Sequence, residues 1–188
     1  LAQSNTVEAF GPTLDEVVVT ARKREESLQD VPLPVTALSA ADIANRQVTS
    51  LDDVAKFTPG LVFSKSFGRT TERPVVRGLA SVLAGTNASV ETGAAYFIDG
   101  VYYQGAIQSL DMNDVERVEV IRGPQSALYG RNTYSGAINF VTREPGQDVK
   151  GKVIAEVSSW SSYDVSGSFE GGLTDSITGR VTVRDFKR

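Results

Sequence analysis

Two residue types are missing from the 188-residue sequence, which contains no cysteine and no histidine. Without cysteine the chain can form no disulfide, no thiolate metal site and no thiol nucleophile. Without histidine it lacks the base of a Ser-His-Asp triad and the ligands of an H-E-x-x-H zinc site. Any metal bound by the chain itself would need hard oxygen ligands. Most familiar enzyme chemistry is therefore excluded.

Basic charge and long apolar runs are also scarce. Lys and Arg number 19 against 23 Asp and Glu, and the longest basic run is Arg22–Arg24. No basic stripe is present, so we expect no nucleic-acid binding. No stretch approaches the roughly 20 apolar residues of a transmembrane helix, although membrane β-strands are short and alternating and remain compatible with the sequence. With 40% hydrophobic residues the chain can form a core.

The first 30 residues are predicted to be a flexible segment that carries one β-prone run. Residues 1–15 are polar, and EVVVTA at 16–21 lies between them and a charged run. Prolines follow at positions 32 and 34, so the run has no obvious local partner. It is either an edge strand of this domain or a strand that adds to the sheet of another protein.

Residues 31–146 are predicted to form a compact α+β domain. Ser39 with Asp42, and Ser50 with Asp53, are capping-box pairs, which predict short helices from residues 40 and 51. Asp99-Gly100 predicts a hairpin turn. Strands are expected at 35–38, 61–63, 74–77, 95–98, 101–103 and 137–142, with a turn of helix at 125–129.

The segment 114–122 is expected to be a short helix that runs into a strand. Its charges at Glu116, Arg117, Glu119 and Arg122 alternate with apolar residues. They form either a solvated strand face or a set of ion pairs with a wall outside the domain. The glycines at 123, 130 and 136 lack the spacing of a nucleotide-binding loop.

After residue 150 apolar and polar residues alternate strictly. Residues 163–173 and 177–183 each have one apolar and one polar side, and Thr174-Asp175-Ser176 forms a turn between them. Residues 152–160 fit less well because Ile154 interrupts their polar side. A two-faced strand fits a soluble sheet, or an outer-membrane barrel with lipid outside and a polar lumen.

The long motif DVERVEVIRGPQSALYGRNTYSGAINFVTREP at 114–145 closely resembles the plug-domain signature of TonB-dependent outer-membrane receptors. VVRG at 75–78 and YFIDGVY at 96–102 match the same family, and EVVVTA at 16–21 resembles its TonB box. The resemblance covers about residues 16–146, and residues 150–188 look like the first barrel strands.

This resemblance implies three parts. Residues 1–30 would be the flexible segment with the box, and 31–146 an α+β plug with a small mixed sheet and short helices. Residues 150–188 would be the first two to three antiparallel strands of a 22-stranded transmembrane β-barrel. Because 22 strands of ~9–11 residues need well over ~200 residues, we expect the chain to be an N-terminal fragment of a longer receptor.

The resemblance also implies roles for particular residues. The TonB-binding residues would be Glu16, Val17, Val18, Val19, Thr20 and Ala21. Contacts between plug and barrel would come from Arg77, Glu119, Arg122 and Arg131. Tight turns would lie at Gly78, Asp99, Gly100, Gly123, Pro124, Gly130 and Gly136. Apical loops at 64–72, 81–93 and 103–109 would face the substrate, with Arg69, Arg73, Tyr102, Tyr103 and Gln104.

The function implied by the family is TonB-dependent active transport of a scarce nutrient across the outer membrane, with the plug accessible from the periplasm. The nutrient would be a siderophore–iron complex, another metal chelate, a vitamin or a glycan. Expected partners are TonB, outer-membrane lipid and the substrate, and the family implies no enzymatic activity, no cofactor and no metal bound by the chain itself. Tyr163, Val165, Phe169, Val181 and Val183 would face lipid, and Arg180 and Arg184 the lumen. The alternative is a stand-alone secreted binding or adhesion module with a plug-like fold. A hydrolase that uses Glu91 and Asp99 serves only as a contrast.

Overall fold

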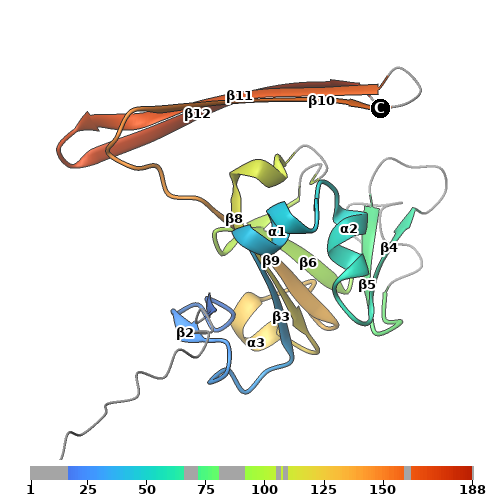
Figure 1. Ribbon diagram of the computed structural model, residues 1–188. Helices are drawn as coiled ribbons and strands as arrows, with labels where there is room; N and C mark the ends of the chain where they lie inside the picture. Colours follow the sequence, from blue (N-terminus) through green and yellow to red (C-terminus); the bar gives the residue numbers. More distant parts are fainter. Residues whose placement is uncertain are drawn as a thin grey trace, which may run out of the picture.

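A mixed β-sheet organises the part of the chain that the computed structural model describes, namely residues 17–65, 72–80, 92–104, 107, 110–158 and 162–187. The sheet has the strand order β3-β8-β9-β6-β7 (Figure 1). Neighbouring strands pair antiparallel except β6 and β9, which are parallel. The five strands are β3 (Val35–Ser39), β6 (Ala94–Ile98), β7 (Val101–Tyr103), β8 (Val115–Arg122) and β9 (Gly136–Thr142).

Shorter elements surround this sheet. Two further antiparallel pairs join β1 (Val18–Val19) to β2 (Glu26–Ser27) and β4 (Leu61–Lys65) to β5 (Glu72–Val76). The helices are α1 (Ala40–Asn45), α2 (Leu51–Lys56), the 3-10 helix η2 (Met112–Asp114) and α3 (Ser126–Tyr129). Both predicted capping boxes are present, at Ser39 with Asp42 and at Ser50 with Asp53. Each box satisfies N–H groups that a helix start leaves without partners.

Both faces of the sheet are covered, so its central strands carry buried residues on both sides. Val118 and Val120 of β8 and Phe140 of β9 belong to a core that includes residues of α1, α2, β4 and β5. Ile121 of β8 belongs to a second core, with Val19 of β1 and residues of β6 and α3. The N-terminal hairpin therefore covers the face that α1 and α2 leave open (Figure 1).

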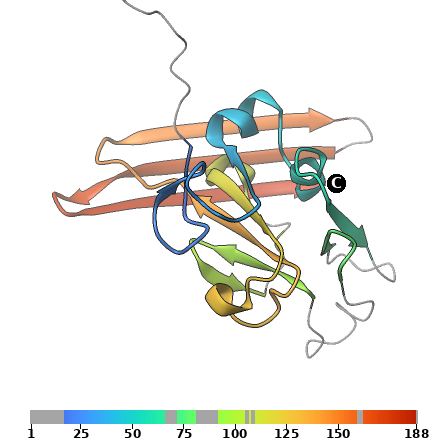
Figure 2. The same cartoon turned by 90° about the horizontal axis from the view of Figure 1, so that it is seen from below.

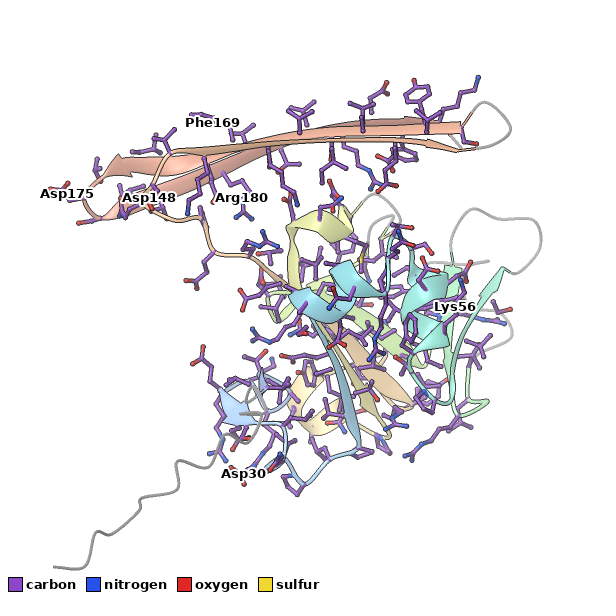
Figure 3. The ribbon with its side chains drawn as sticks, in the orientation of Figure 1. Asp30, Lys56, Asp148, Phe169, Asp175 and Arg180 are labelled. Atoms are coloured by element: carbon purple, nitrogen blue, oxygen red, sulfur yellow. The ribbon has the colours of Figure 1, made fainter. Side chains whose placement is uncertain are left out.

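The C-terminal part is a three-stranded antiparallel sheet of β10 (Lys150–Ser158), β11 (Ser162–Thr174) and β12 (Ile177–Lys187). It lies across one side of the domain (Figure 2). Phe169 points away from the domain and Arg180 towards it (Figure 3), as the alternating pattern predicts. Ile154 is half-buried on the side that faces the domain, where it lines a small cavity with Arg184.

Three predictions about local structure are wrong. The β-prone run at 17–21 has a local partner, because Val18 pairs with Ser27 and Val19 with Glu26. Residues 17–30 are accordingly part of the folded domain, whereas the expected tail at 1–16 lies outside the described residues. Residues 115–122 form one continuous strand, because the tertiary pairing with both β3 and β9 overrides the short helical pattern. The turn of helix precedes that strand, as η2.

Gly136 marks a close contact between β8 and β9. A Cβ atom at this position would lie 2.6 Å from the carbonyl oxygen of Ile121. We expect Gly136→Ala to lower the free energy of unfolding in guanidinium chloride by about 1–3 kcal/mol, because the strands must move apart. Gly167→Ala is the control, since no atom lies within 4 Å of its added Cβ, and it should change stability by less than about 0.5 kcal/mol. Equal losses for both variants would contradict the assignment.

Candidate functional site

The segment Val17–Ala21 is folded onto the sheet and forms the candidate partner-binding site. Val19 and Ala21 are fully buried in the second core, whereas Val18 is 42% exposed. Leu28 N–H donates to Val17 O at 2.8 Å and closes the open end of the β1–β2 hairpin. Burial of a valine side chain stabilises by about 1.5–3 kcal/mol, so Val19 is the main apolar anchor of this segment.

A buried carboxylate holds the polar end of the segment. Glu119 of β8 has no exposed surface. One of its oxygens, Oε1, accepts from Thr20 N–H at 2.7 Å, from Thr20 Oγ1 at 3.1 Å and from Arg117 Nε at 2.8 Å. The Arg117 side chain is only 14% exposed. A buried charge is tolerated when it is paired and hydrogen-bonded, and Thr20 and Arg117 together meet that condition.

The other polar atoms of Thr20 also have partners in the domain. Its carbonyl oxygen accepts from Lys23 N–H at 2.8 Å and from the Tyr129 hydroxyl at 3.4 Å. Its Oγ1 accepts from Asn139 Nδ2 at 3.4 Å, and Asn139 Oδ1 in turn accepts from Gly100 N–H at 3.0 Å. Thr20 is therefore bonded to β8, β9 and α3. Lys23 lies over the ring of Tyr129, with its Nζ 5.5 Å from the ring centroid.

A cavity of about 840 Å³ opens beside the docked segment. Its walls come from the hairpin tip, the Asp99-Gly100 turn, the start of β8 and the chain that leaves β9. Both signs of charge line it, with Lys23, Arg24, Arg117 and Arg143 against Glu25, Asp99, Glu116 and Glu144. Such a lining suits a polar segment of a protein partner better than an apolar ligand.

The residues expected to contact a barrel are dispersed. Arg77 and Arg131 are exposed, and Arg122 is half-buried with its Nη1 donating to Pro59 O at 3.1 Å. Glu119 lies inside the domain under Thr20, so the interpretation of 116–122 as a solvated face is wrong at this position. Arg117, Tyr129 and Asn139 were not among the predicted site residues. Asn139 had a signal in the sequence, since it is a polar residue within the apolar strand 137–142.

The predicted turn residues are found in turns or at a close approach. Asp99 and Gly100 form the β6–β7 turn with positive φ, and Asp99 accepts from Thr142 N–H at 2.8 Å and from Thr142 Oγ1 at 2.7 Å. Gly136 lies against Ile121, as described above. Positive φ is also found at Gly78, Gly123 and Gly130, and Pro124 follows Gly123 just after the end of β8.

The residues expected to face a substrate have mixed surroundings. Arg69 lies outside the described residues, and Arg73 of β5 is half-buried with its Nη2 donating to Ser64 Oγ at 3.5 Å. The Tyr102 hydroxyl accepts from Asn132 Nδ2 at 2.6 Å and from Gln104 Nε2 at 3.3 Å, and Gln104 is exposed. Tyr103 packs against the first core.

Among the described residues no group of His, Asp or Glu side chains could hold a metal ion. No helix in this part of the chain is both long and apolar enough to cross a membrane.

Comparison with known proteins places this architecture in a family. The model described as TonB-dependent Receptor Plug Domain matches residues 27–137. The vitamin B12 transporter BtuB of Photobacterium profundum is 32% identical over 174 residues, which cover 90% of this chain and 27% of that protein. The pesticin receptor of Yersinia pestis is 29% identical over 184 residues, covering 97% and 26%.

A solved structure agrees with these relatives. The ferric yersiniabactin uptake receptor FyuA from Yersinia pestis has a TM-score of 0.69 and 29% identity, over 81% of this chain and 24% of that one. The chain thus spans about a quarter of the length of the proteins it matches. These relatives are transporters and receptors rather than enzymes, and they do not favour the stand-alone secreted module.

Tyr129 gives a test of the docked segment at high pH. Burial, with the nearby charge of Glu119 adding to it, raises the pKa of the Tyr129 hydroxyl from 10.0 to about 12. A raised pKa in the folded state means that the stabilisation is complete below pH 10 and is lost as pH rises towards 12. In ultraviolet difference spectra we expect the tyrosinate signal that appears near pH 12 to be smaller by one tyrosine in Tyr129→Phe. An unchanged signal near pH 12 in Tyr129→Phe would contradict the assignment.

Proposed function

Because the chain belongs to the family of TonB-dependent receptor plug domains, we propose that it serves TonB-dependent active transport of a scarce nutrient across the outer membrane. In this proposal residues 31–146 are the plug, and residues 16–21 are the TonB box that recruits TonB in the periplasm. The position of Val17–Ala21 carries the proposal. It is a short β-prone segment in which Val18 is exposed, and its strand pairing is limited to two residue pairs.

The three C-terminal strands support a membrane location. The side of β10–β12 that faces away from the plug exposes Val153, Val157, Phe169, Val181 and Val183, each by more than 60%. A continuous apolar surface of this kind marks a contact with membrane or protein. We propose that these strands begin the 22-stranded barrel, with this side in lipid and Arg180 and Arg184 in the lumen.

One end of the apolar surface has the character of a membrane interface. Tyr163 is opposite Lys187 in the strand register, and its hydroxyl donates to Asp185 Oδ2 at 3.0 Å. Outer-membrane strands place aromatic residues at the two edges of their apolar band. This tyrosine with its charged neighbours therefore fits the headgroup level, beyond the valine-rich middle of β12.

The docked segment implies competition for the TonB box. A strand that adds to residues 17–21 needs their free backbone groups, yet Thr20 N–H donates to Glu119 and Val17 O accepts from Leu28. TonB and the plug cannot use these groups at the same time. The apparent affinity for TonB is then proportional to the fraction of molecules whose box is undocked.

The nutrient belongs to one of the classes moved by this family, namely siderophore–iron, another metal chelate, a vitamin or a glycan. The relatives suggest two of these classes, since one is a vitamin B12 transporter and another is a ferric yersiniabactin uptake receptor. In either case the plug carries the ligand without reacting with it, and the chelator holds any metal.

The strand-addition step can be tested with a substitution at the exposed position of the box. We expect Val18→Pro to weaken capture of the cognate TonB C-terminal domain by about tenfold or more, because proline lacks the N–H that a ladder requires. Val18→Thr is the matched control, since it keeps the N–H and the β-branch. Capture of Val18→Pro at the wild-type level would refute the box assignment.

The competition can be tested at the buried carboxylate. Glu119→Gln keeps the shape but removes the charge that Thr20 and Arg117 share, and hydrogen bonds to a charged group contribute about 1.5–3 kcal/mol each. We expect undocking to become easier and the Kd for TonB to fall by about tenfold. The measurement is a titration of purified protein with the TonB domain. A Kd that is unchanged or higher would argue against competition.

A further inference from the structure

The contact between the plug and the C-terminal sheet depends on two arginines of β12. Arg180 and Arg184 are four residues apart on one strand, so both side chains lie on the side that faces the plug. Each is only 12% exposed in a sheet whose opposite side is open. Neither was expected from the family resemblance to hold the plug, since the predicted contacts were Arg77, Glu119, Arg122 and Arg131.

Each arginine is oriented by an acid on the neighbouring strand β11. Arg184 donates from Nε to Asp164 Oδ1 at 2.9 Å and also bonds Asp164 through Nη2. Arg180 donates from Nε to Glu170 Oε2 at 2.8 Å and bonds it through Nη2 as well. In both cases the guanidinium uses one edge for the carboxylate, which fixes its plane and leaves Nη1 free to reach the plug.

Both free Nη1 groups donate to backbone carbonyls of the plug. Arg184 Nη1 reaches Leu110 O at 3.3 Å, and Arg180 Nη1 reaches Arg143 O at 3.0 Å. The two acceptors belong to segments that are bonded to each other, since Arg143 N–H donates to Asp114 O at 2.9 Å. The pair of arginines thus holds one unit, formed by the 110–114 turn and the start of the chain that leads into β10.

The turn is held together by hydrogen bonds between its own residues. Asp111 Oδ1 accepts from Asn113 N–H at 3.0 Å and from Asn113 Nδ2 at 2.9 Å. Met112 is buried in the first core. A cavity of only about 20 Å³ lies between this turn and Arg184.

From these contacts we propose that Arg180 and Arg184 are positioning residues that clamp the plug to the first strands of the wall. Asp164 and Glu170 orient the two guanidinium groups, and backbone carbonyls on the plug accept their hydrogen bonds. The inference rests on the proposed role of β10–β12 as wall. Since carbonyls are the acceptors, side-chain substitutions on the plug would leave the clamp in place, whereas the guanidinium geometry on the wall is essential. Lysine cannot replace it, because one ammonium cannot bond the carboxylate edge-on and reach the carbonyl as well.

Hydrogen exchange of the full-length protein in detergent micelles tests the clamp. We expect Arg184→Gln and Arg184→Lys to speed exchange of the amides at 110–115 at least about fivefold, because the turn loses its hold on the wall. Arg180→Gln should speed exchange at 142–146. Exchange in α2 and β6 should stay at the wild-type rate. Lys187→Gln is the charge-matched control on the same strand, and it should leave all these segments unchanged.

Two results would overturn the clamp. One is wild-type exchange at 110–115 in both Arg184 variants. The other is an equal rise in the exchange rate over the whole plug, which would indicate loss of the fold rather than of a local contact. In that case Asp164→Asn, which keeps the arginine and removes only the charge that orients it, should also speed exchange over the whole plug. Neither result depends on TonB binding, so the Val18→Pro experiment can fail or succeed independently of this one.

Discussion

The carboxylate of Glu119 is the group on which the arrangement of the plug depends. It lies without exposed surface on the interior strand β8, where an unpaired charge would cost several kcal/mol. Arg117 supplies one partner from the same strand, but the backbone N–H of Thr20 comes from a residue 99 positions earlier in the chain. The sheet therefore depends on the N-terminal segment as much as it binds that segment. If the segment left, the charge of Glu119 would have to be solvated by water.

The same requirement explains why the sheet is buried on both faces. Val118 and Val120 belong to the core that α1 and α2 share, while Glu119 and Ile121 point to the hairpin side. A strand with this alternation needs two covers. One cover is made of the capped helices together with β4 and β5. The other is the β1–β2 hairpin, with its two strand pairs and the hydrogen bonds of Thr20 to Glu119 and Tyr129.

Much of this could be predicted from the sequence, for identifiable reasons. The capping boxes at Ser39 and Ser50, the Asp99-Gly100 turn and the alternation after residue 150 are local signals, and each is present in the structure. The pairing of Val19 with Glu26 was not predicted, because two-residue strands leave no periodicity to detect. Glu119 illustrates the other limit: its charge pattern resembles that of a solvated face, and only its contact with distant Thr20 shows that it is buried. The clamp arginines could be assigned to the correct side of β12 but not to an acceptor, since a backbone carbonyl has no sequence signature.

The geometry of the β1–β2 hairpin has a mechanical consequence. Val17 and Leu28 are adjacent at its open end, and the chain continues from Leu28 into the folded domain. A pull on the residues before Val17 therefore meets the pairs one after another, from Leu28 to Ser27 to Glu26, and never all together. Unzipping of this kind needs far less force than shearing the same bonds in parallel. A small tension on the N-terminus would separate β1 from β2 one pair at a time, whereas each strand of β10–β12 is joined to its neighbour by nine or more pairs.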